Sequence, residues 1–553
     1  MPSVSAHVAL TLAQHIDAVF GVMGNGNAYF LDAIETQTDA VFTAVRHEQG
    51  AVVAADAHFR ASGRIAAGTS TYGAGFTNTL TALAEAVQAR VPLVLVVGDE
   101  PTSGPRPWDV DQIALASAVG ARTYTVGHAD AAATTVIAIE HALTYRLPVV
   151  LAIPYDVATL DAGSVPEVPA PRLLTPLAPK GEFAEGMLDE IAAALSQAER
   201  PFLLAGRGAW LAGAGDALGE LAALTGALTA SSALGRGVFP DERFDLGVTG
   251  GFGADGAMEL IRTADVAVVF GAALNQFTMR FGELFAPGTR VFQIDIAPAA
   301  THAHIGGFVR ADARVAAEAL VARVGSASSA AAPGVPWRES VDVAAARTYE
   351  KGDDLAADGR LDPRSAARRI AELLPRDRVV VSDGGHFIGW ANMYWPVEAP
   401  DRMMMVGTAF QSIGQGWPSM VGAALARRDS TIVLTSGDGG GLMAIADLES
   451  AVRAAAGRGI AVIWNDAAYG AEVNLYGLKG LAAGPMRIPE VDFAAFGAAV
   501  GAEGVVVKTL ADLDRLGAWA QEDAATRRFL LLDLRISGDV IAPYQQEIIR
   551  VNS

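Results

Sequence analysis

Residues 431–473 read TIVLTSGDGGGLMAIADLESAVRAAAGRGIAVIWNDAAYGAEV. Two short apolar runs, 431–435 and 460–464, predict buried parallel strands. Between them, the glycine-rich stretch 437–441 predicts a break in the chain, and apolar residues at helical spacing predict a helix over 442–456. Together these signals predict a β-α-β unit of a doubly wound α/β fold.

Polar side chains follow both strands of this unit. Asp438 comes after the first strand and Asn465 ends the second. In a right-handed crossover these strand ends lie at one edge of the sheet, where such folds bind ligands. One carboxylate, one amide oxygen and nearby carbonyls suit Mg²⁺, which takes further ligands from water and phosphates. Bare glycines would let a diphosphate approach backbone amides. A plain glycine turn beside a polar strand end is the alternative that these residues leave open.

Length and composition restrict the class of protein. The chain has 553 residues, of which 51% are hydrophobic, and no cysteine. This excludes disulfides and cysteine chemistry, and the length predicts three or four domains. We see no basic leader before an apolar segment and no run of about 18 apolar residues. A net charge of −20 argues against nucleic acid and anionic membranes as partners. We therefore expect a cytoplasmic, oligomeric α/β protein.

Alternating helical and strand patterns divide the chain into three segments, 1–175, 183–325 and 350–553. A proline-rich stretch, 167–180, predicts the first linker, and a Ser/Ala/Pro-rich stretch, 326–336, predicts the second. Outside the opening unit, apolar runs predict strands at 19–22, 41–45, 65–69, 92–97, 148–153, 202–205, 267–270 and 291–295, with helices at 6–18 and 51–62. The predicted fold is three doubly wound parallel-sheet domains.

A second motif, His47-Glu48-Gln49-Gly50, stands where a strand ends and a helix of small residues begins. Apolar neighbours on both sides predict that Glu48 is desolvated, so that it can share a proton with a heterocycle nitrogen. The alternative is a carboxylate that only caps the helix. His47 is expected either to orient this turn or to touch substrate.

Five sequence segments, taken in their order along the chain, resemble the motifs of a known enzyme family. They are HEQGAVVAADAHFRASGR (47–64), TYGAGFTNTLTALAEAVQARVPLVLVVGD (71–99), SDGGHFIGWANMYW (382–395), QSIGQGWPSMVGAALA (411–426), and Gly-Asp-Gly followed by Asn465. In this order they resemble the acetolactate-synthase-like thiamine-diphosphate (ThDP) enzymes over essentially the whole chain. The resemblance implies a pyrimidine-binding domain (1–175), a middle domain (183–325) and a diphosphate-binding domain (350–553), with ThDP and Mg²⁺ as cofactors.

The resemblance also implies roles for single residues. Glu48 would activate the pyrimidine of a cofactor held by the partner chain, which makes a homodimer the minimal active unit and a homotetramer the expected assembly. Asp438 and Asn465 would bind Mg²⁺ by their side chains and Ala467 by its carbonyl. Ile413 would support the bent cofactor. The implied cofactor-binding set is Gly384, Gly385, His386, Phe387, Gln411, Ile413, Gly437, Asp438, Gly439, Gly440, Asn465, Ala467, Tyr469 and Gly470.

The substrate side is implied at Asn25, Thr71 and Tyr72. Gln112 falls where relatives carry an active-site glutamine, although the residues before it, 105–111, depart from the family pattern. For Gln112 we keep open the alternative of a polar residue in a solvent-exposed loop.

The type of reaction is less sharply defined. Residues 469–476 and 485–493 look closer to benzoylformate-decarboxylase-like members. Those enzymes use active-site histidines, and in this chain Thr71 and Thr278 stand at those places. Because threonine cannot act as a general acid near pH 7, an enamine intermediate would persist and attack a second carbonyl. This favours a carboligase that uses a 2-oxo acid donor. The alternatives are a non-oxidative 2-oxo acid decarboxylase or C–C lyase, and a catalytically silent subunit.

The middle segment carries a partial nucleotide motif. Gly206-Arg207-Gly208 follows a predicted strand, but Leu211 replaces the third glycine of the fingerprint. Relatives bind FAD, ADP or nothing in this domain, and we expect no nucleotide, so that FAD is an improbable cofactor. His302 and His304 are expected to be surface residues rather than a metal-binding pair.

Overall fold

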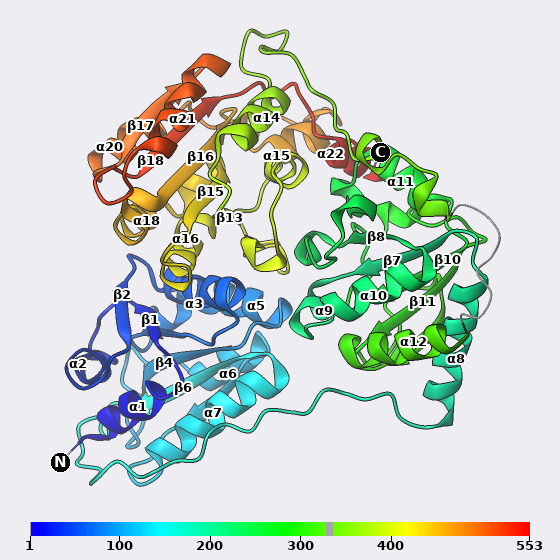
Figure 1. Ribbon diagram of the computed structural model, residues 1–553. Coiled ribbons are helices and arrows are strands. Elements are labelled where there is room, and N and C mark those ends of the chain that lie inside the picture. The colour runs from blue at the N-terminus through cyan, green and yellow to red at the C-terminus, as the bar shows by residue number, and fades with distance from the viewer. Residues whose placement is uncertain (1, 328–335, 553) are drawn as a thin grey trace.

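The computed structural model describes residues 2–327 and 336–552. Three six-stranded sheets, all of them parallel, are covered by helices (Figure 1). This confirms the predicted fold class. The second predicted linker, 326–336, lies almost entirely outside the described residues, whereas 167–180 contains no helix or strand.

The N-terminal sheet has the strand order β2-β1-β3-β4-β6-β5. Its strands are β1 (Ala18–Gly21), β2 (Val41–Ala44), β3 (Ala67–Ser70), β4 (Leu93–Asp99), β5 (Arg122–Thr125) and β6 (Pro148–Pro154). The main helices are α1 (Val4–Leu12), α2 (Ala28–Gln37), α3 (Glu48–Ser62), α5 (Leu80–Gln88), α6 (Gln112–Ala118) and α7 (Ala131–Tyr145). The sequence did not predict β5, because this edge strand is polar and largely unburied. The predicted helix over 6–18 ends earlier, at Leu12.

The middle sheet has the order β12-β11-β10-β7-β8-β9. The strands are β7 (Pro201–Ala205), β8 (Leu228–Ser231), β9 (Asp245–Val248), β10 (Val266–Phe270), β11 (Arg290–Asp295) and β12 (Ile305–Arg310). Helices α8 (Glu182–Gln197), α9 (Arg207–Leu211), α10 (Gly215–Thr225), α11 (Asp255–Arg262) and α12 (Ala313–Ala327) flank this sheet. Its order is that of a dinucleotide-type fold.

The C-terminal sheet repeats the N-terminal order as β14-β13-β15-β16-β18-β17. Its strands are β13 (Arg378–Ser382), β14 (Met403–Met405), β15 (Thr431–Gly437), β16 (Gly459–Asn465), β17 (Glu503–Val507) and β18 (Leu530–Arg535). The principal helices are α14 (Pro363–Leu373), α15 (Ile388–Tyr394), α16 (Gly416–Ala426), α20 (Phe493–Ala499), α21 (Asp514–Gln521) and α22 (Pro543–Asn552). The two outer sheets therefore share one topology, with a switch point beside their first strand.

The helical part of the opening unit differs from the prediction. The glycines do not break the chain: they form the first turn of α17 (Asp438–Met443). The predicted helix over 442–456 is then divided, because a 3₁₀ turn (Ile445–Asp447) separates α17 from α18 (Leu448–Ala455). At this turn Asp447 accepts a hydrogen bond of 2.7 Å from the backbone amide of Arg46. A contact with the N-terminal domain thus occurs where the helix is interrupted.

The N- and C-terminal domains pack through α3 and α16. These helices approach so closely that a Cβ at Gly422 would overlap the carbonyl oxygen of Ala54. Beside this crossing, the buried Arg60 side chain bonds Asp56, donates to Glu85 at 3.1 Å, and donates to the carbonyl of Met405 at 3.2 Å. The seam is therefore held by backbone proximity and by one fully buried ionic network.

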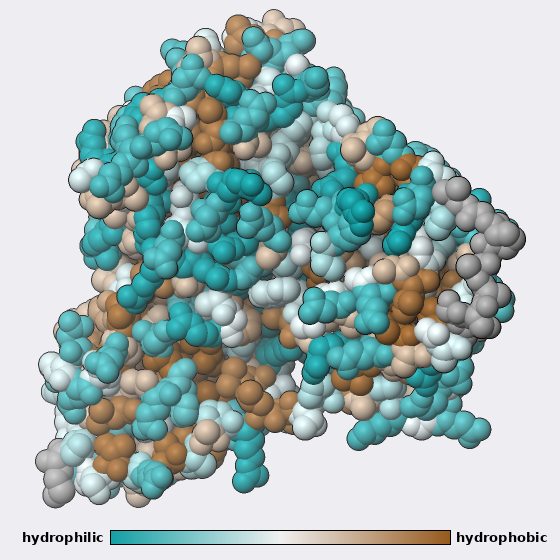
Figure 2. Space-filling view, viewed as in Figure 1, coloured by the Kyte–Doolittle hydropathy of each residue, from teal (hydrophilic) through white to brown (hydrophobic). Residues whose placement is uncertain are grey.

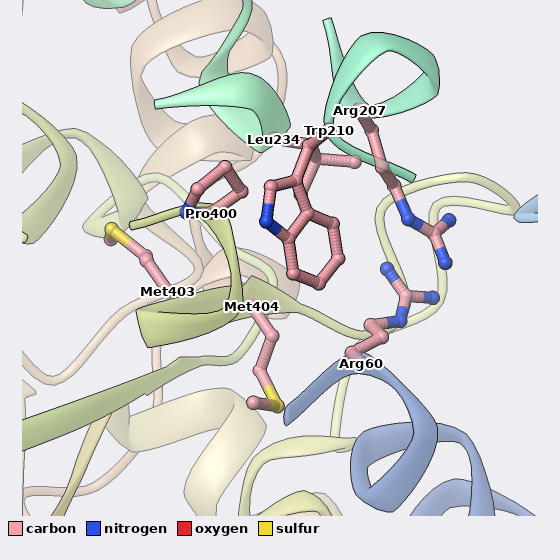
Figure 3. A pocket seen from close by; sticks show the side chains of 7 residues that line it. All are labelled: Arg60, Arg207, Trp210, Leu234, Pro400, Met403 and Met404. Carbon is pink, nitrogen blue, oxygen red and sulfur yellow. The ribbon is translucent and has the colours of Figure 1, made fainter. Parts of the chain in front are cut away.

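The middle domain contacts both the N-terminal and the C-terminal domain at this network. Arg207 and Trp210 face Arg60 and Met404 across a small void (Figure 3). Arg207 donates to the carbonyl of Ala89 at 2.7 Å. Burial, together with the nearby Arg60 charge, lowers the pKa of Arg207 to about 9. All three domains thus share one junction.

The surface has apolar regions as well as polar ones. On the face shown in Figure 2, apolar residues gather over the N-terminal domain at the lower left of the view. Exposed large apolar side chains of that domain include Tyr29, Trp108 and Ile113. Contiguous apolar surface of this kind is typical of an interface. Within the described residues, every helix is too short or too polar to cross a membrane.

Gly422→Ala should destabilise the protein by about 2 kcal/mol or more, because the added methyl group overlaps the backbone of α3. Gly186→Ala is the matched control, since Gly186 lies in α8 with open space around its Cβ position. That variant should gain about 0.5–1 kcal/mol from helix propensity. Urea unfolding of both variants measures the difference, and equal effects at the two glycines would contradict the close crossing.

Candidate active site

The predicted site residues form two groups on the two outer domains. One group lies at the carboxyl ends of β1, β2 and β3 in the N-terminal domain, and the other at the carboxyl ends of β13, β15 and β16 in the C-terminal domain. Both positions flank the switch point of a doubly wound sheet, where ligands bind in such folds.

Glu48 is the first residue of α3 and is half-buried. Its Oε2 accepts a hydrogen bond of 2.9 Å from Nδ2 of Asn78. His47 caps the helix instead, because its Nδ1 accepts from the amide of Gln49 at 3.2 Å. The alternative of Glu48 as the capping side chain is therefore wrong. Its carboxylate is held by a side chain from the turn 71–78, and its other oxygen, Oε1, has no hydrogen-bond partner among the residues that the structure describes.

The predicted substrate residues surround this carboxylate turn. Thr71 Oγ1 accepts from the amide of Gly26 at 2.9 Å, which joins the ends of β1 and β3. Asn25 beside it is exposed. The ring of Tyr72 lies 4.1 Å from the guanidinium carbon of Arg106, a cation–π contact. Arg106 belongs to the segment that departs from the family pattern, so this departure places a cation over a predicted substrate residue.

Gln112 is the first residue of α6 and only 3% of it is exposed. Its Oε1 accepts from the amide of Gly73, and its Nε2 donates to the carbonyl of Gly98 and to Asp99. The alternative of a solvent-exposed loop residue is therefore wrong. Gln112 ties the turn after β3 to the end of β4, next to Tyr72.

In the C-terminal group, Asp438 directly follows β15 and Asn465 ends β16, and the two residues lie at matching positions because Gly437 pairs with Trp464 in the register of these strands. Both side chains are buried. Asn465 donates through Nδ2 to Asp533 and to the carbonyl of Val491, which leaves its buried Oδ1 without a partner in the described chain. An amide oxygen left in this way is ready to bind a cation.

Asp438 has the charge that such a site needs. Its Oδ1 accepts from the amide of Gly439 at 2.8 Å. Burial, and then the nearby Asp466 carboxylate, raise the pKa of Asp438 to about 7. A buried carboxylate beside an unpartnered amide oxygen fits a hard divalent cation, which would neutralise the charge.

The third predicted ligand, Ala467, has a left-handed backbone with φ of 59°. Such a conformation costs energy for a residue other than glycine and is often found at functional sites. Its carbonyl accepts one hydrogen bond, from the amide of Ile488 at 3.0 Å, so one lone pair is left for a metal. Gln411, which is exposed, has the same left-handed conformation.

Glycines make the floor of the C-terminal group because side chains lie directly on them. Ile413 contacts both Gly384 and Gly440, where added Cβ atoms would lie 3.6 and 3.1 Å from its side chain. The other predicted cofactor residues show the same arrangement, namely Phe387 on Gly437 and Gly385, Tyr469 on Gly439, and His386 on Gly470. We call this set of packed glycines, Gly384, Gly385, Gly437, Gly439, Gly440 and Gly470, the cradle. Ile413, the residue expected to support a bent cofactor, lies against two of them.

His386 forms an ion pair that the sequence did not suggest. Its Nε2 lies 2.9 Å from Oδ2 of Asp466. Burial alone would lower the pKa of His386, but the Asp466 carboxylate outweighs burial and raises it. The only sequence signal for Asp466 was its position directly after Asn465.

Asp383 is a second residue that the prediction missed. It is buried, and its Oδ1 accepts from the amides of Gly384, Gly414 and Gln415 at 2.8, 3.0 and 3.1 Å. Its Oδ2 accepts from the hydroxyl of Ser436 at 3.0 Å. Burial raises the pKa of Asp383. This one carboxylate joins three segments of the cradle, including the one that carries Ile413.

Comparison with known proteins bears on this geometry. Three models of the thiamine pyrophosphate (ThDP) enzymes match the chain: the N-terminal TPP binding domain at 2–115, the central domain at 188–320, and the C-terminal TPP binding domain at 383–534. The chain belongs to the thiamine pyrophosphate enzyme family.

The chain is also similar to individual members. It is 28% identical to acetolactate synthase isozyme 3 large subunit of Escherichia coli over 80% of this chain and 78% of that protein. It is 27% identical to sulfoacetaldehyde acetyltransferase of Roseovarius nubinhibens over 98% of this chain and 93% of that protein. A solved structure of a candidate thiamin diphosphate-dependent enzyme from Mycobacterium smegmatis has a TM-score of 0.76, with 22% identity, covering 96% of this chain and 99% of that one. That structural likeness supports the fold.

Asp383→Ala should destabilise the protein by about 3 kcal/mol or more, because three buried amides lose their acceptor. Asp383→Asn is the matched control: it keeps Oδ1 and should cost about 1 kcal/mol. Urea unfolding measures stability, and the rate of chymotryptic cleavage after the exposed Phe410 reports local opening. Equal behaviour of the two variants would contradict the bracing role.

Proposed function

We propose that the protein is a ThDP- and Mg²⁺-dependent carboligase: a 2-oxo acid donor loses CO₂, and its remaining acyl unit is joined to the carbonyl carbon of an acceptor, whose oxygen takes up a proton. The observation that carries the proposal is the Glu48 carboxylate, which Asn78 holds, in a site where threonines stand at the two places of the decarboxylases' histidine acids. Thr71 stands at one of those places, with its hydroxyl bonded to the turn after β1, and the buried Thr278 stands at the other. The relatives named acetolactate synthase support the same reaction type.

In this proposal each group of residues has one task. ThDP, when bound, supplies a nucleophilic carbon that attacks carbonyl groups. Asp438, Asn465 and the Ala467 carbonyl hold Mg²⁺, and the backbone segments of Gly384, Gly439 and Gly440 face the diphosphate. Glu48 holds a proton at the free Oε1 for exchange with the pyrimidine, while Asn78 fixes the orientation of its carboxylate.

We further propose that two chains build each active site. Among the described residues, no hydrogen bond or ion pair joins the group around Glu48 to the group around Asp438 within one chain. Ile413, Phe410 and Met443, on and beside the cradle, are 37%, 50% and 55% exposed. A partner's N-terminal domain would cover these apolar residues and bring its own Glu48 to the cofactor. The minimal unit is then a homodimer, which we propose pairs into a homotetramer.

The reaction is tested with purified protein, ThDP and Mg²⁺, given a panel of 2-oxo acids with and without aldehyde or 2-oxo acid acceptors. Mass spectrometry should find coupled hydroxyketones or hydroxy-oxo acids. Free aldehyde and CO₂ alone would establish the decarboxylase alternative. No turnover of any acid would favour a silent subunit or lyase chemistry on another carbonyl.

Asp438→Asn should weaken Mg²⁺-dependent ThDP binding by about 100-fold or more, because the site loses its one anionic metal ligand while the Gly439 hydrogen bond is kept. Isothermal titration calorimetry with Mg²⁺ and with EDTA measures this loss. Asp342→Asn, which changes an exposed helix cap in the same isosteric way, is the control and should bind normally. A normal affinity of Asp438→Asn would remove the metal assignment.

Glu48→Gln should keep ThDP affinity and lower turnover by about 10²–10⁴-fold, because the amide cannot exchange a proton with the pyrimidine. Glu35→Gln, an exposed change on α2 of the same domain, is the control. An unchanged rate in Glu48→Gln would exclude the assigned role.

Mixing these two inactive variants tests the shared site. When Glu48→Gln and Asp438→Asn chains are unfolded together and refolded, about half of the dimers are mixed, and one site in each mixed dimer has both native residues. Activity should therefore return to about a quarter of the wild-type value. If each site were built within one chain, the mixture would stay inactive.

A further inference from the structure

A second cavity lies between the middle and C-terminal domains. It has a volume of about 490 Å³, within the range of small-molecule sites. Its walls come from the loop after β8, from β9, from residues 347–351 and from the end of α15. None of its lining residues belongs to the two groups of the candidate active site. The cavity is therefore a separate feature of the fold.

Four cationic side chains line this cavity: Arg236, Arg347, Lys351 and Arg368. None of them has a carboxylate oxygen within 4 Å in the described residues, although ion pairs are common elsewhere, as between Arg515 and Glu503. The chain as a whole has a net charge of −20. Four unpaired cations gathered in one cavity of an acidic protein create a local field that attracts anions.

Two of these guanidinium groups are incompletely bonded in the interior. Arg236 is only 9% exposed, and donates to the carbonyls of Trp395 and Asn392 at 3.3 and 2.6 Å. Its Nε, and the Nε of Arg368, are buried without a hydrogen-bond partner among the described residues. Burial of these nitrogens keeps water from screening the guanidinium charges fully, so both groups add to the positive field in the cavity.

Three acidic residues also line the cavity, and the charges of Arg347 and Arg236 act on one of them, Asp245, against the effect of burial on its pKa. Asp245 is buried and accepts from the amide of Gly247 at 2.9 Å. Burial raises the pKa of Asp245 to about 6. Glu398 lies 3.9 Å from Arg376, which is outside the lining, and Glu242 is the third acid. Cations therefore outnumber acids, and none of the three acids forms an ion pair with them.

Aromatic rings form the remaining wall. Tyr349 and Tyr394 contact each other with 5.4 Å between ring centroids and a tilt of 44° between ring planes, and both line the cavity. The tyrosine hydroxyls donate to the carbonyls of Phe252 and Glu350, so the rings can offer the cavity mainly apolar surface. A ligand with both an anionic head and an apolar body would match the two kinds of wall.

We propose that this cavity binds a small organic anion, in which a carboxylate or phosphate group contacts Arg236 and Arg368 and an aromatic or apolar body rests on Tyr349 and Tyr394. Arg347 and Lys351, which are exposed, attract the anion at the entrance. The proposal is independent of the reaction at the ThDP site, because it concerns binding at other residues.

Calorimetric titration of the protein saturated with ThDP and Mg²⁺, at pH 8, tests the site with three probes: benzoate, phenylphosphate and the neutral benzyl alcohol. The two anions should bind and the alcohol should not, and the better anion identifies the head group. Reversal of the entrance charges by Arg347→Glu with Lys351→Glu should weaken anion binding about tenfold or more. Asp245→Asn, which removes a negative charge from the cavity, should strengthen it about threefold.

The matched control is Arg172→Glu with Lys180→Glu, because both residues are exposed, lie outside the cavity and form no ion pair among the described residues. This double variant should bind the anions like the wild type. Three results would overturn the proposal: no anion binding up to about 10 mM, equal binding of benzyl alcohol, or equal affinity of the two double variants. Binding that persists unchanged after charge reversal would place the anion at the ThDP site instead.

Discussion

The crossing of α3 and α16 at Ala54 and Gly422 is the contact on which the rest of the structure depends. It joins the two outer domains at van der Waals distance, and only a glycine on α16 permits it. α3 begins with Glu48, and α16 follows directly after the Ile413 segment. The same helix pair that packs the domains therefore also fixes the starting points of both halves of the candidate active site. The ionic network of Arg60 is buried beside it and is fully bonded, so that a lateral shift of the helices would leave charges unpaired.

Much of the fold could be predicted because buried parallel strands are short, apolar and followed by polar turns. The strands at 41–45, 148–153 and 460–464 are examples, and the structure confirms them within one or two residues. The prediction for the glycines after Gly437 was wrong, because glycine usually breaks helices. Here their missing side chains leave space that Tyr469 and Ile413 fill, and this tertiary packing is not visible in the local sequence. β5 escaped prediction because an edge strand needs no continuous apolar run.

For the site, sequence identified residues that stand at strand ends but not the residues that hold them. Asp383 accepts hydrogen bonds from backbone amides more than thirty positions away, and Asp466 forms an ion pair with the ring of His386. Neither contact has a local sequence pattern. Gln112 was ambiguous for the same reason, since its partners Gly73 and Gly98 belong to other strands. These supporting contacts join segments that are distant in sequence. A single sequence contains no signal that shows which distant segments meet in the fold.

A buried acceptor without a partner among the described residues supports the proposed metal site. Buried polar groups are normally satisfied, so an exception requires an explanation. At Asn465 the amide hydrogens are fully used and only Oδ1 is left, beside a carboxylate whose ionised form burial disfavours. A cation explains both facts at once. In the cavity beside β9 the sign is reversed, because four cationic side chains line it, and an anion is the ligand that we propose there. The proposed metal site and the proposed anion cavity thus differ in the sign of the charge that their residues present to a ligand.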